Sequence, residues 1–202
     1  MANSKHANQI AAVTGGTGAI GRAIAHQLAD FGYNVVLITR NKPKSKRTVE
    51  EIIRETGNHR VSYQLANLAR HTEIEKLRTA WQGPLSILIN NAGATPHERL
   101  ETPEGIEMQF ATNVLGYFWM IQEFKDLLKA SSPSRVINVA SYWAGGLNFA
   151  DLEFEKRTYR NGAAYRQSKQ ANRMLTAAFA PRLEDDGITV NACHPGDVNS
   201  KL

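Results

Sequence analysis

Short apolar runs alternate along this sequence with longer stretches of helical period. Ile10–Thr14 is an apolar run that ends in glycines, and Asn34–Thr39 is rich in β-branched residues. Runs of the same kind follow at 61–65, 85–90, 135–140 and 188–193. Buried parallel strands have this character, and strands separated by helices require right-handed crossovers. We therefore expect an α/β protein with a Rossmann-type, doubly wound parallel sheet covered by helices on both faces, in three layers.

The stretches between these runs carry hydrophobic residues every three or four positions, as one face of a helix does. We expect helices with the stripe Ile20, Ile24, Leu28 and Phe31, around 74–81, and at 43–56, 104–129 and 163–180. Gly32 and Gly57 follow two of them as terminators. Pro181 removes one backbone hydrogen bond, so we expect the last helix to end or kink there. The chain has 202 residues and no internal repeat or linker, which predicts one domain over residues 1–202.

A glycine-rich turn separates the first strand from the first helix, with the sequence Thr14-Gly15-Gly16-Thr17-Gly18-Ala19-Ile20-Gly21. Glycines allow a tight turn and a close approach to a pyrophosphate, and the helix N-terminus offers free N–H groups and a positive dipole end. Any tight strand-to-helix turn favours glycine, but this one follows an apolar strand and opens an amphipathic helix. We expect a dinucleotide phosphate site formed by Gly15, Thr17, Gly18, Ala19, Ile20 and Gly21.

The end of the second strand bears on which dinucleotide binds. Thr39 is followed by Arg40, and no carboxylate occurs until Glu50. An arginine can clamp a 2′-phosphate, whereas a carboxylate there would bond the ribose 2′-hydroxyl and repel the phosphate. The sequence therefore favours NADP (NADPH) over NAD. The alternative is that Arg40 merely ends a strand.

Basic residues cluster after that position, in a chain of net charge +5 and pI about 9.4. The cluster consists of Lys42, Lys44, Lys46 and Arg47. It is compatible with a solvated loop and helix start, or with attraction of a phosphate-rich cofactor. We expect no nucleic-acid partner, because no nucleic-acid-binding motif accompanies the charge.

Tyr165 and Lys169 lie four residues apart within an expected helix, so they share one helix face. A free phenol, with a pKa of about 10, is a poor acid or base at neutral pH. A nearby ammonium favours the phenolate and lowers the pKa of a phenol. Such a pair can move a proton to or from a substrate oxygen. The alternative is a half-exposed helix face without chemistry.

Four motifs follow one another along the chain. They are the glycine turn, Asn90-Asn91-Ala92-Gly93, Tyr165-x-x-x-Lys169 and Pro195-Gly196. In this order and at these spacings they resemble the short-chain dehydrogenase/reductase family over nearly the whole chain. The chain looks most like the branch of retinol dehydrogenases and related oxidoreductases. The pointers to that branch are Thr39-Arg40-Asn41, the segment 113–118 and the long insertion between Ser141 and Tyr165.

The resemblance implies roles for the residues that match its motifs. Tyr165 would be the general acid in carbonyl reduction and the base in alcohol oxidation. Lys169 would lower the pKa of that phenol and hold the nicotinamide ribose. Ser141 would hydrogen-bond the substrate oxygen, and Asn113 would support a proton relay to Lys169 through water. The adenosine side would be lined by Asn91, Ala92 and Gly93, and the nicotinamide side by Pro195, Gly196, Val198 and Ser200.

The sequence also departs from the family pattern. Ala19 stands where the main branch has its middle glycine, which leaves glycines at three-residue spacing as in the branch that acts on sugar nucleotides. Asn67 replaces a common aspartate facing adenine, so adenine recognition would rest on Asn67 and the adjacent Leu68. The chain stops at Leu202, before the usual substrate-covering segment. We expect a missing C-terminal segment; the alternatives are a disordered tail or a partner that supplies the cover.

These features predict an NADP-dependent oxidoreductase that interconverts a carbonyl and an alcohol on a small-molecule substrate. The alternatives are a non-catalytic NADP-binding regulator and, from the glycine spacing alone, a sugar-nucleotide epimerase. The six histidines show no ligand spacing, so we expect no metal site. We expect no membrane span and, since the N-terminus lacks a signal-peptide core and Cys193 is the single cysteine, a cytoplasmic protein. Cys193 is expected to be buried in its strand, and a homo-oligomer is possible.

Overall fold

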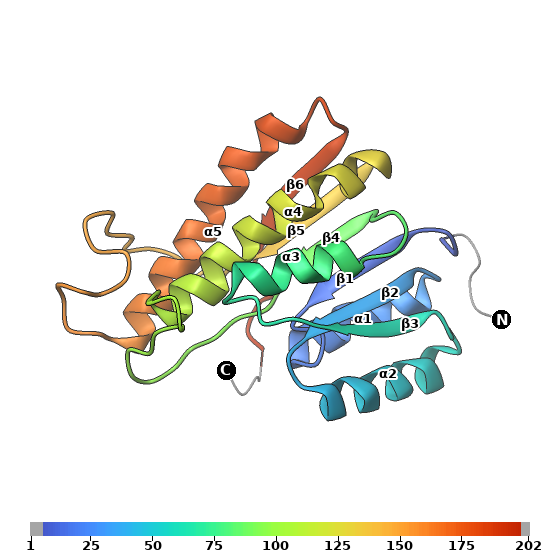
Figure 1. The fold of residues 1–202 in the computed structure, drawn as a ribbon, viewed down its shortest axis with the longest axis horizontal. Coiled ribbons are helices and arrows are strands. Elements are labelled where there is room, and N and C mark those ends of the chain that lie inside the picture. Colours follow the sequence, from blue (N-terminus) through green and yellow to red (C-terminus); the bar gives the residue numbers. More distant parts are fainter. Residues whose placement is uncertain (1–5, 199–202) are drawn as a thin grey trace.

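The computed structural model describes residues 6–198 and contains one six-stranded parallel sheet (Figure 1). The strand order is β3-β2-β1-β4-β5-β6. The strands are β1 (Ile10–Thr14), β2 (Asn34–Thr39), β3 (Val61–Leu65), β4 (Ile87–Asn90), β5 (Ser134–Val139) and β6 (Ile188–Cys193). The chain runs outward from β1 to β3 and then returns to pair β4 with the other side of β1. The predicted doubly wound Rossmann-type sheet is confirmed.

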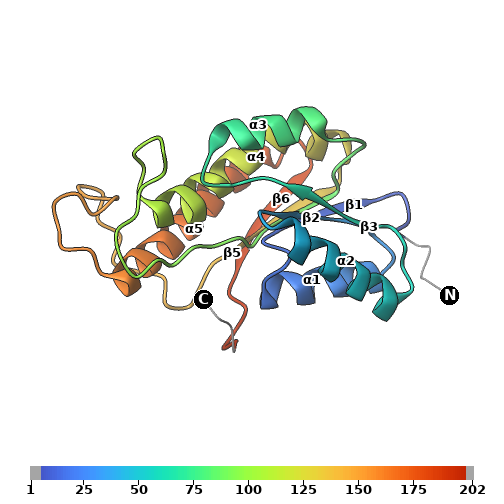
Figure 2. The same ribbon diagram turned by 60° about the horizontal axis from the view of Figure 1, so that its bottom comes forward.

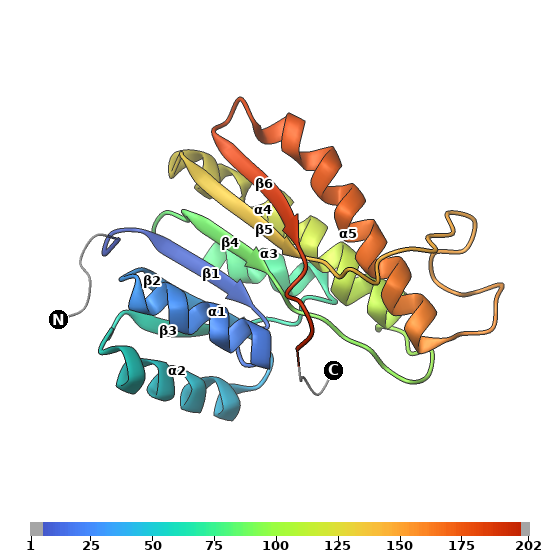
Figure 3. The same cartoon turned by 180° about the vertical axis from the view of Figure 1, so that it is seen from behind.

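Helices cover both faces of this sheet and give three layers (Figures 2 and 3). One face carries α1 (Ala19–Asp30) and α2 (Lys42–Thr56). The other carries α3 (His71–Ala80), the π-helical turn η1 (Phe110–Leu115), α4 (Gly116–Ala130) and α5 (Asn161–Leu183). None of the helices within residues 6–198 is both long and apolar enough to cross a membrane.

Two hydrophobic cores lie on the two faces of the sheet. The larger one packs α3, α4 and α5 against the sheet and contains Phe124, whose ring meets that of Trp81 edge-on with 5.3 Å between centroids. The smaller one joins Ile52 of α2 to the small side chains of α1 and to the opposite face of β1 and β2. Strands buried on both faces are almost continuously apolar, which is why β1, β2 and β4 were recognisable as strands.

The contact of α1 with the sheet differs from the expected stripe. The buried positions of this helix are its small residues, Gly21, Ala25 and Ala29. Ile24 and Leu28 flank them and are only partly buried, and Phe31 is about half exposed. Small residues let the helix backbone approach the sheet closely, so the bulkier residues pack beside the contact.

Two helix boundaries differ from the prediction. The helix expected to begin at Glu104 begins only at Met108, because Gly105 adopts φ +81° in a turn and Glu101 pairs with Glu107 in a short antiparallel bridge. The last helix does not end at Pro181 but continues to Leu183. The proline lies two residues before the end of the helix, so its missing N–H removes one backbone hydrogen bond without ending the helix at that point.

Cys193 is exposed, not buried as expected. It ends β6, which is an edge strand in the described part of the chain, and the last three residues of this strand are all exposed. An apolar run therefore marks a strand correctly, while the burial of its end depends on what covers it.

Candidate active site

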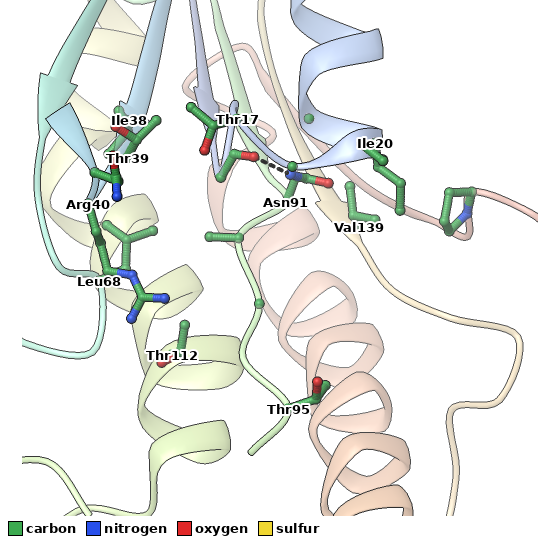
Figure 4. A pocket seen from close by; sticks show the side chains of 18 of the residues that line it. Thr17, Ile20, Ile38, Thr39, Arg40, Leu68, Asn91, Thr95, Thr112 and Val139 are labelled. Atoms are coloured by element: carbon green, nitrogen blue, oxygen red, sulfur yellow. Dashed lines mark hydrogen bonds between the residues drawn. The ribbon is translucent and has the colours of Figure 1, made fainter. Parts of the chain in front are cut away.

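A cleft of about 720 Å³ opens at the carboxyl ends of the strands (Figure 4). It lies where β1 and β4 send their chains to opposite sides of the sheet. In open α/β sheets this topological switch point is where ligands bind. The cleft is lined by the glycine turn, the end of β2, the segment after β4, and residues of α5.

The glycine turn packs too tightly for side chains at two of its positions. Gly15 adopts φ +64°, and a Cβ atom there would lie 2.8 Å from Cα of Ala92. A Cβ atom at Gly21 would overlap the carbonyl oxygen of Gly15 and lie 2.7 Å from Nδ2 of Asn91. These glycines bring the start of α1 into contact with the segment after β4, which forms the floor of the cleft.

The N-terminus of α1 faces the cleft without a competing anion. Gly18 is its N-cap and offers no side-chain acceptor, and no acidic residue occurs in the first turn. Thr17, Ala19 and Ile20 line the cleft at this point. The first N–H groups of a helix have no partner within it, and the dipole favours negative charge there. This end of the cleft is therefore suited to an anionic group such as a phosphate.

Thr14 ties β1 to the end of β4 and holds the cleft floor. Its hydroxyl accepts hydrogen bonds from the backbone N–H groups of Asn91 (2.8 Å) and Ala92 (3.0 Å) and donates to the carbonyl of Ile89 (3.2 Å). Nδ2 of Asn91 donates to the carbonyls of Thr14 (2.9 Å) and, more weakly, Gly15 (3.4 Å). The amide and the threonine thus fix the spacing of two neighbouring strands.

Two cations lie at the opposite end of the cleft, after β2. Arg40 extends along the cleft from the strand end (Figure 4), and Lys44 lines the same wall from the first turn of α2. The side chain of Asn41 caps α2 by accepting a hydrogen bond from the Lys44 N–H at 2.9 Å. No carboxylate within residues 6–198 pairs with Arg40 or Lys44. Their charge is therefore available to an anionic ligand.

Tyr165 and Lys169 line the cleft from α5. The Lys169 side chain is buried, and its Nζ donates a hydrogen bond of 2.7 Å to the carbonyl of Val139. Nζ lies 5.8 Å from the centroid of the Tyr165 ring. Burial lowers the pKa of Lys169 to about 8, because desolvation penalises the ammonium. A phenol and a buried ammonium thus occupy the same wall, as their spacing on the helix predicted.

Asn113 and Ser141 lie beside the cleft rather than in its lining. Asn113 is fully buried in the π-helical turn and clamps Ala94 by accepting from its N–H (2.7 Å) and donating to its carbonyl (3.0 Å). It also donates to the hydroxyl of Ser168 at 3.1 Å. The hydroxyl of Ser141 accepts a hydrogen bond from the Trp143 N–H at 3.1 Å, so its own hydrogen remains free to donate.

A family model described as short chain dehydrogenase matches residues 9–202 of the sequence. The chain belongs to this family. It lies in the retinol dehydrogenase-like branch: it is 38% identical to retinol dehydrogenase 13 of Homo sapiens over 94% of this chain, and 35% identical to human retinol dehydrogenase 11 over 96%. A probable oxidoreductase of Streptomyces antibioticus is 36% identical over 95% of this chain. The chain spans 59%, 62% and 65% of the lengths of these three relatives.

Solved structures of the family share the fold. A metagenomic short-chain oxidoreductase in complex with NADP superposes with a TM-score of 0.78 at 26% identity, covering 96% of this chain and 84% of that one. The RhlG/NADP active-site complex of Pseudomonas aeruginosa gives a TM-score of 0.78 at 28% identity, covering 100% of this chain and 77% of that one.

The cleft gathers most of the residues predicted for cofactor binding. These are Gly15, Thr17, Gly18, Ala19, Ile20, Gly21, Arg40, Leu68, Asn91, Ala92, Gly93, Tyr165, Lys169 and Pro195. The sequence did not assign several further lining residues to the cofactor site, namely Ile38, Thr39, Asn41, Ala66, Thr95, Thr112, Val139 and Ala140. Most are apolar or small residues at strand ends. They come together at the carboxyl ends of the strands only because of the strand order.

Some predicted positions do not line the cleft. Asn67 was expected to face adenine, but its side chain accepts a hydrogen bond from the Ala69 N–H (3.2 Å) in its own turn, and its neighbours Ala66 and Leu68 line the wall instead. Gly196 and Val198 also lie outside the lining, and Val198 is exposed. Ser200 falls outside the described residues.

One group of metal-ligand side chains comes together within residues 6–198. His71 and Glu75 of α3 meet Glu123 of α4, with ligand atoms within 4.8 Å of one another. Nε2 of His71 is 2.8 Å from a carboxylate oxygen of Glu123, so these two already form a pair. The group is partly exposed on the two helices and does not line the cleft.

Proposed function

We propose that the protein is an NADP-dependent oxidoreductase that interconverts a carbonyl and an alcohol on a small-molecule substrate. The observation that carries this proposal is the arrangement of one cleft. The anion-binding helix end, two unpaired cations and the Tyr165–Lys169 pair all line it. A phosphate-rich dinucleotide needs the first two features, and proton transfer to a substrate oxygen needs the third.

The cleft fits a nicotinamide dinucleotide with a 2′-phosphate. Gly15 and Gly21 leave room for backbone only, so the pyrophosphate would lie against the N–H groups at the start of α1. Arg40 and Lys44 would hold the 2′-phosphate by charge-assisted hydrogen bonds. The two solved relatives in complex with NADP, at 26 and 28% identity, support the same choice.

The bound dinucleotide would supply a hydride to the carbonyl carbon, or accept one from the alcohol. Tyr165 would donate its phenolic proton to the carbonyl oxygen during reduction and accept it back during oxidation, so that no charge develops on that oxygen. The ammonium of Lys169 would help Tyr165 to release its proton. The free hydroxyl hydrogen of Ser141 would hydrogen-bond the substrate oxygen.

Asn113 has a second, structural contribution to this arrangement. Its amide clamps Ala94 in the segment after β4 and bonds Ser168 of α5. It therefore holds the dinucleotide side of the cleft at a fixed distance from the helix that carries Tyr165. Near-attack geometry depends on such fixed distances.

The proposal is tested by incubating the purified protein with NADPH and a panel of aldehydes and ketones, and with NADP⁺ and the matching alcohols, while the nicotinamide absorbance is followed. We expect turnover with at least one pair, and free NADPH released during alcohol oxidation. Tyr165→Phe should lower kcat at least 1,000-fold, at the upper part of the range that one acid–base group contributes, while NADPH still binds. Tyr33→Phe is the matched control, because Tyr33 directly precedes the amino end of β2 and does not line the cleft at the carboxyl ends of the strands.

Three results would contradict the proposal. Full activity of Tyr165→Phe would remove the proton-transfer role. NADPH binding without turnover over the whole panel would favour a non-catalytic binding protein, and retention of the nicotinamide without release of NADPH would favour an epimerase.

A further inference from the structure

Tyr117 is a buried phenol that lies outside the cleft lining. It follows the π-helical turn at the start of α4 and has no exposed surface. Its hydroxyl is 3.4 Å from the carbonyl of Val139, a separation at the long end of hydrogen-bond lengths. Burial strongly raises the pKa of Tyr117, so the side chain stays neutral and cannot supply a negative charge.

The ring of Tyr117 covers the ammonium of Lys169. Nζ lies 5.4 Å from the ring centroid, within the range of a cation–π contact. The carbonyl of Val139 accepts the 2.7 Å hydrogen bond from Nζ, and the Tyr165 ring lies at 5.8 Å. Two aromatic rings and one carbonyl therefore surround this cation.

No acidic side chain within residues 6–198 compensates the charge of Lys169. The groups that face it are Tyr117 on α4, Tyr165 on its own helix, Cys193 on β6, and the carbonyl that ends β5. Although Cys193 as a residue is exposed, partial burial of its thiol raises the pKa of that group, which keeps it neutral near pH 7. A buried ammonium without a carboxylate depends on dipoles and ring faces, and in a desolvated site the cation–π term is at its strongest.

We propose that Tyr117 is a positioning residue whose ring holds the side chain of Lys169 charged and in place beside Tyr165. Its ring acts as an electrostatic surface rather than as an acid or a base, and its hydroxyl contributes little. The effect on turnover rests on the proposed function, whereas the effect on the charge of Lys169 does not. The same short segment thus serves the site twice, since Asn113 holds the cofactor side and Tyr117, one turn later, holds the lysine.

The direct test is an NMR titration of Lys169 in protein labelled with ¹³C at the lysine ε-carbons, with the signal assigned from Lys169→Arg. Burial lowers the pKa of Lys169 to about 8 in the wild type. Tyr117→Leu removes the ring, and we expect its Lys169 to bind the proton about tenfold more weakly, a shift of about one pH unit. Tyr117→Phe keeps the ring, and its titration should stay within about 0.3 unit of the wild type, since the hydroxyl is the part it lacks.

Tyr117→Met is included as a second non-aromatic variant. Its flexible side chain adapts to an irregular gap in the core, so a shift shared with Tyr117→Leu is not an artefact of how leucine packs. We expect it to follow Tyr117→Leu. The inference is overturned if both non-aromatic variants titrate like the wild type, or if Tyr117→Phe shifts as far as they do, which would make the hydroxyl responsible. Unfolding of Tyr117→Leu alone leaves Tyr117→Met and Tyr117→Phe to decide between these outcomes.

Measuring turnover of the wild type and the Tyr117 variants distinguishes a failure of the proposed function from a failure of the role of Tyr117. If the wild type reduces a carbonyl, the non-aromatic variants should lose kcat while their KM for NADPH changes less than about twofold, and Tyr117→Phe should restore kcat. An inactive wild type would contradict the proposed function, and the NMR titration would still decide the role of the ring. An active wild type with unshifted variants would overturn only the role of Tyr117.

Discussion

At the scale of single residues, Lys169 shows a conflict between chemistry and stability. It is 4% exposed and carries a charge that has no carboxylate partner within residues 6–198. A structural role alone would be served better by an apolar side chain, because desolvating an ammonium costs free energy. The retained charge makes sense if Tyr165, on the same helix face, uses it.

This conflict predicts a stability that depends on pH. Burial lowers the folded-state pKa of Lys169 from 10.5 to about 8, so between these values the unfolded chain holds a proton that the folded protein has released. Stability therefore rises with pH across this window and is lower below pH 8. Lys169→Met lacks this titration. Relative to that variant, the wild type should gain about 3 kcal/mol in free energy of unfolding between pH 7.5 and 10.5.

The measurement is urea unfolding of both proteins at several pH values. Lysines and tyrosines remote from Lys169 titrate equally in the two proteins and cancel in the difference. Parallel stability curves for the wild type and Lys169→Met would show that Lys169 is not buried as a cation.

Residue roles were predictable from sequence where local chemistry defines them. The glycines, Arg40 and the Tyr165–Lys169 pair stand out through residue type and spacing. Asn67 does not line the cleft, because its side chain bonds within its own turn, an alternative that asparagine offers at many positions. Its role toward adenine stays a prediction. Thr14 was missed because its partners, Ile89 and Asn91, lie 75 and 77 residues further along the chain.

At the scale of elements, the start of α1 is set by two glycines with different tolerances. A Cβ atom at Gly21 would overlap the backbone of Gly15, while at Gly18 the nearest atom is at an ordinary 3.4 Å. Gly21→Ala should therefore lower the free energy of unfolding by about 1–3 kcal/mol, since backbone atoms cannot yield as a flexible side chain does. Gly18→Ala should lose less, about 0.5 kcal/mol, because its only cost is that alanine is a poorer N-cap residue than glycine.

Chemical denaturation of the two alanine variants and the wild type checks this difference. Equal losses for both variants would mean that α1 can shift away from the segment after β4, against the close packing at Gly21.

Element positions were predictable where the apolar pattern is strong. The bounds of β1, β2, β3 and β6 agree with the sequence prediction. The π-helical turn before α4 was not predicted, because its extra residue per turn reflects how Asn113 and its neighbours pack, and apolar spacing does not record this. The helix start was placed at Glu104 rather than at Met108 because the turn at Gly105 and the Glu101–Glu107 bridge are not visible in the apolar spacing.

At the scale of the whole molecule, the order of the strands creates the site. The residues that line the cleft come from segments as far apart as Gly15 and Pro195. They meet because parallel strands end at one edge and the chain changes direction between β1 and β4. Alternating strands and helices were enough to predict this architecture, but not which apolar residues at the strand ends would form the walls.

The distribution of charge over the molecule agrees with the proposed ligand. The net charge is +5, and a basic cluster occupies positions 42–47. Lys44 of this cluster lines the cleft together with Arg40. Farther along α2, Lys46 pairs with Glu50 at 3.9 Å and lies outside the lining. The free positive charge of this region is thus concentrated where a 2′-phosphate would lie.

The most direct measurement of the central claim is a titration of the purified protein with NADPH and with NADH, before and after Arg40→Ala. We expect NADPH to bind more tightly than NADH, and Arg40→Ala to raise the Kd for NADPH about 10- to 100-fold while changing that for NADH less than about twofold. Lys46→Ala is the control, because it removes the same charge away from the cleft and should change neither Kd by more than about twofold. Tighter binding of NADH, or equal effects of Arg40→Ala on both nucleotides, would contradict the account.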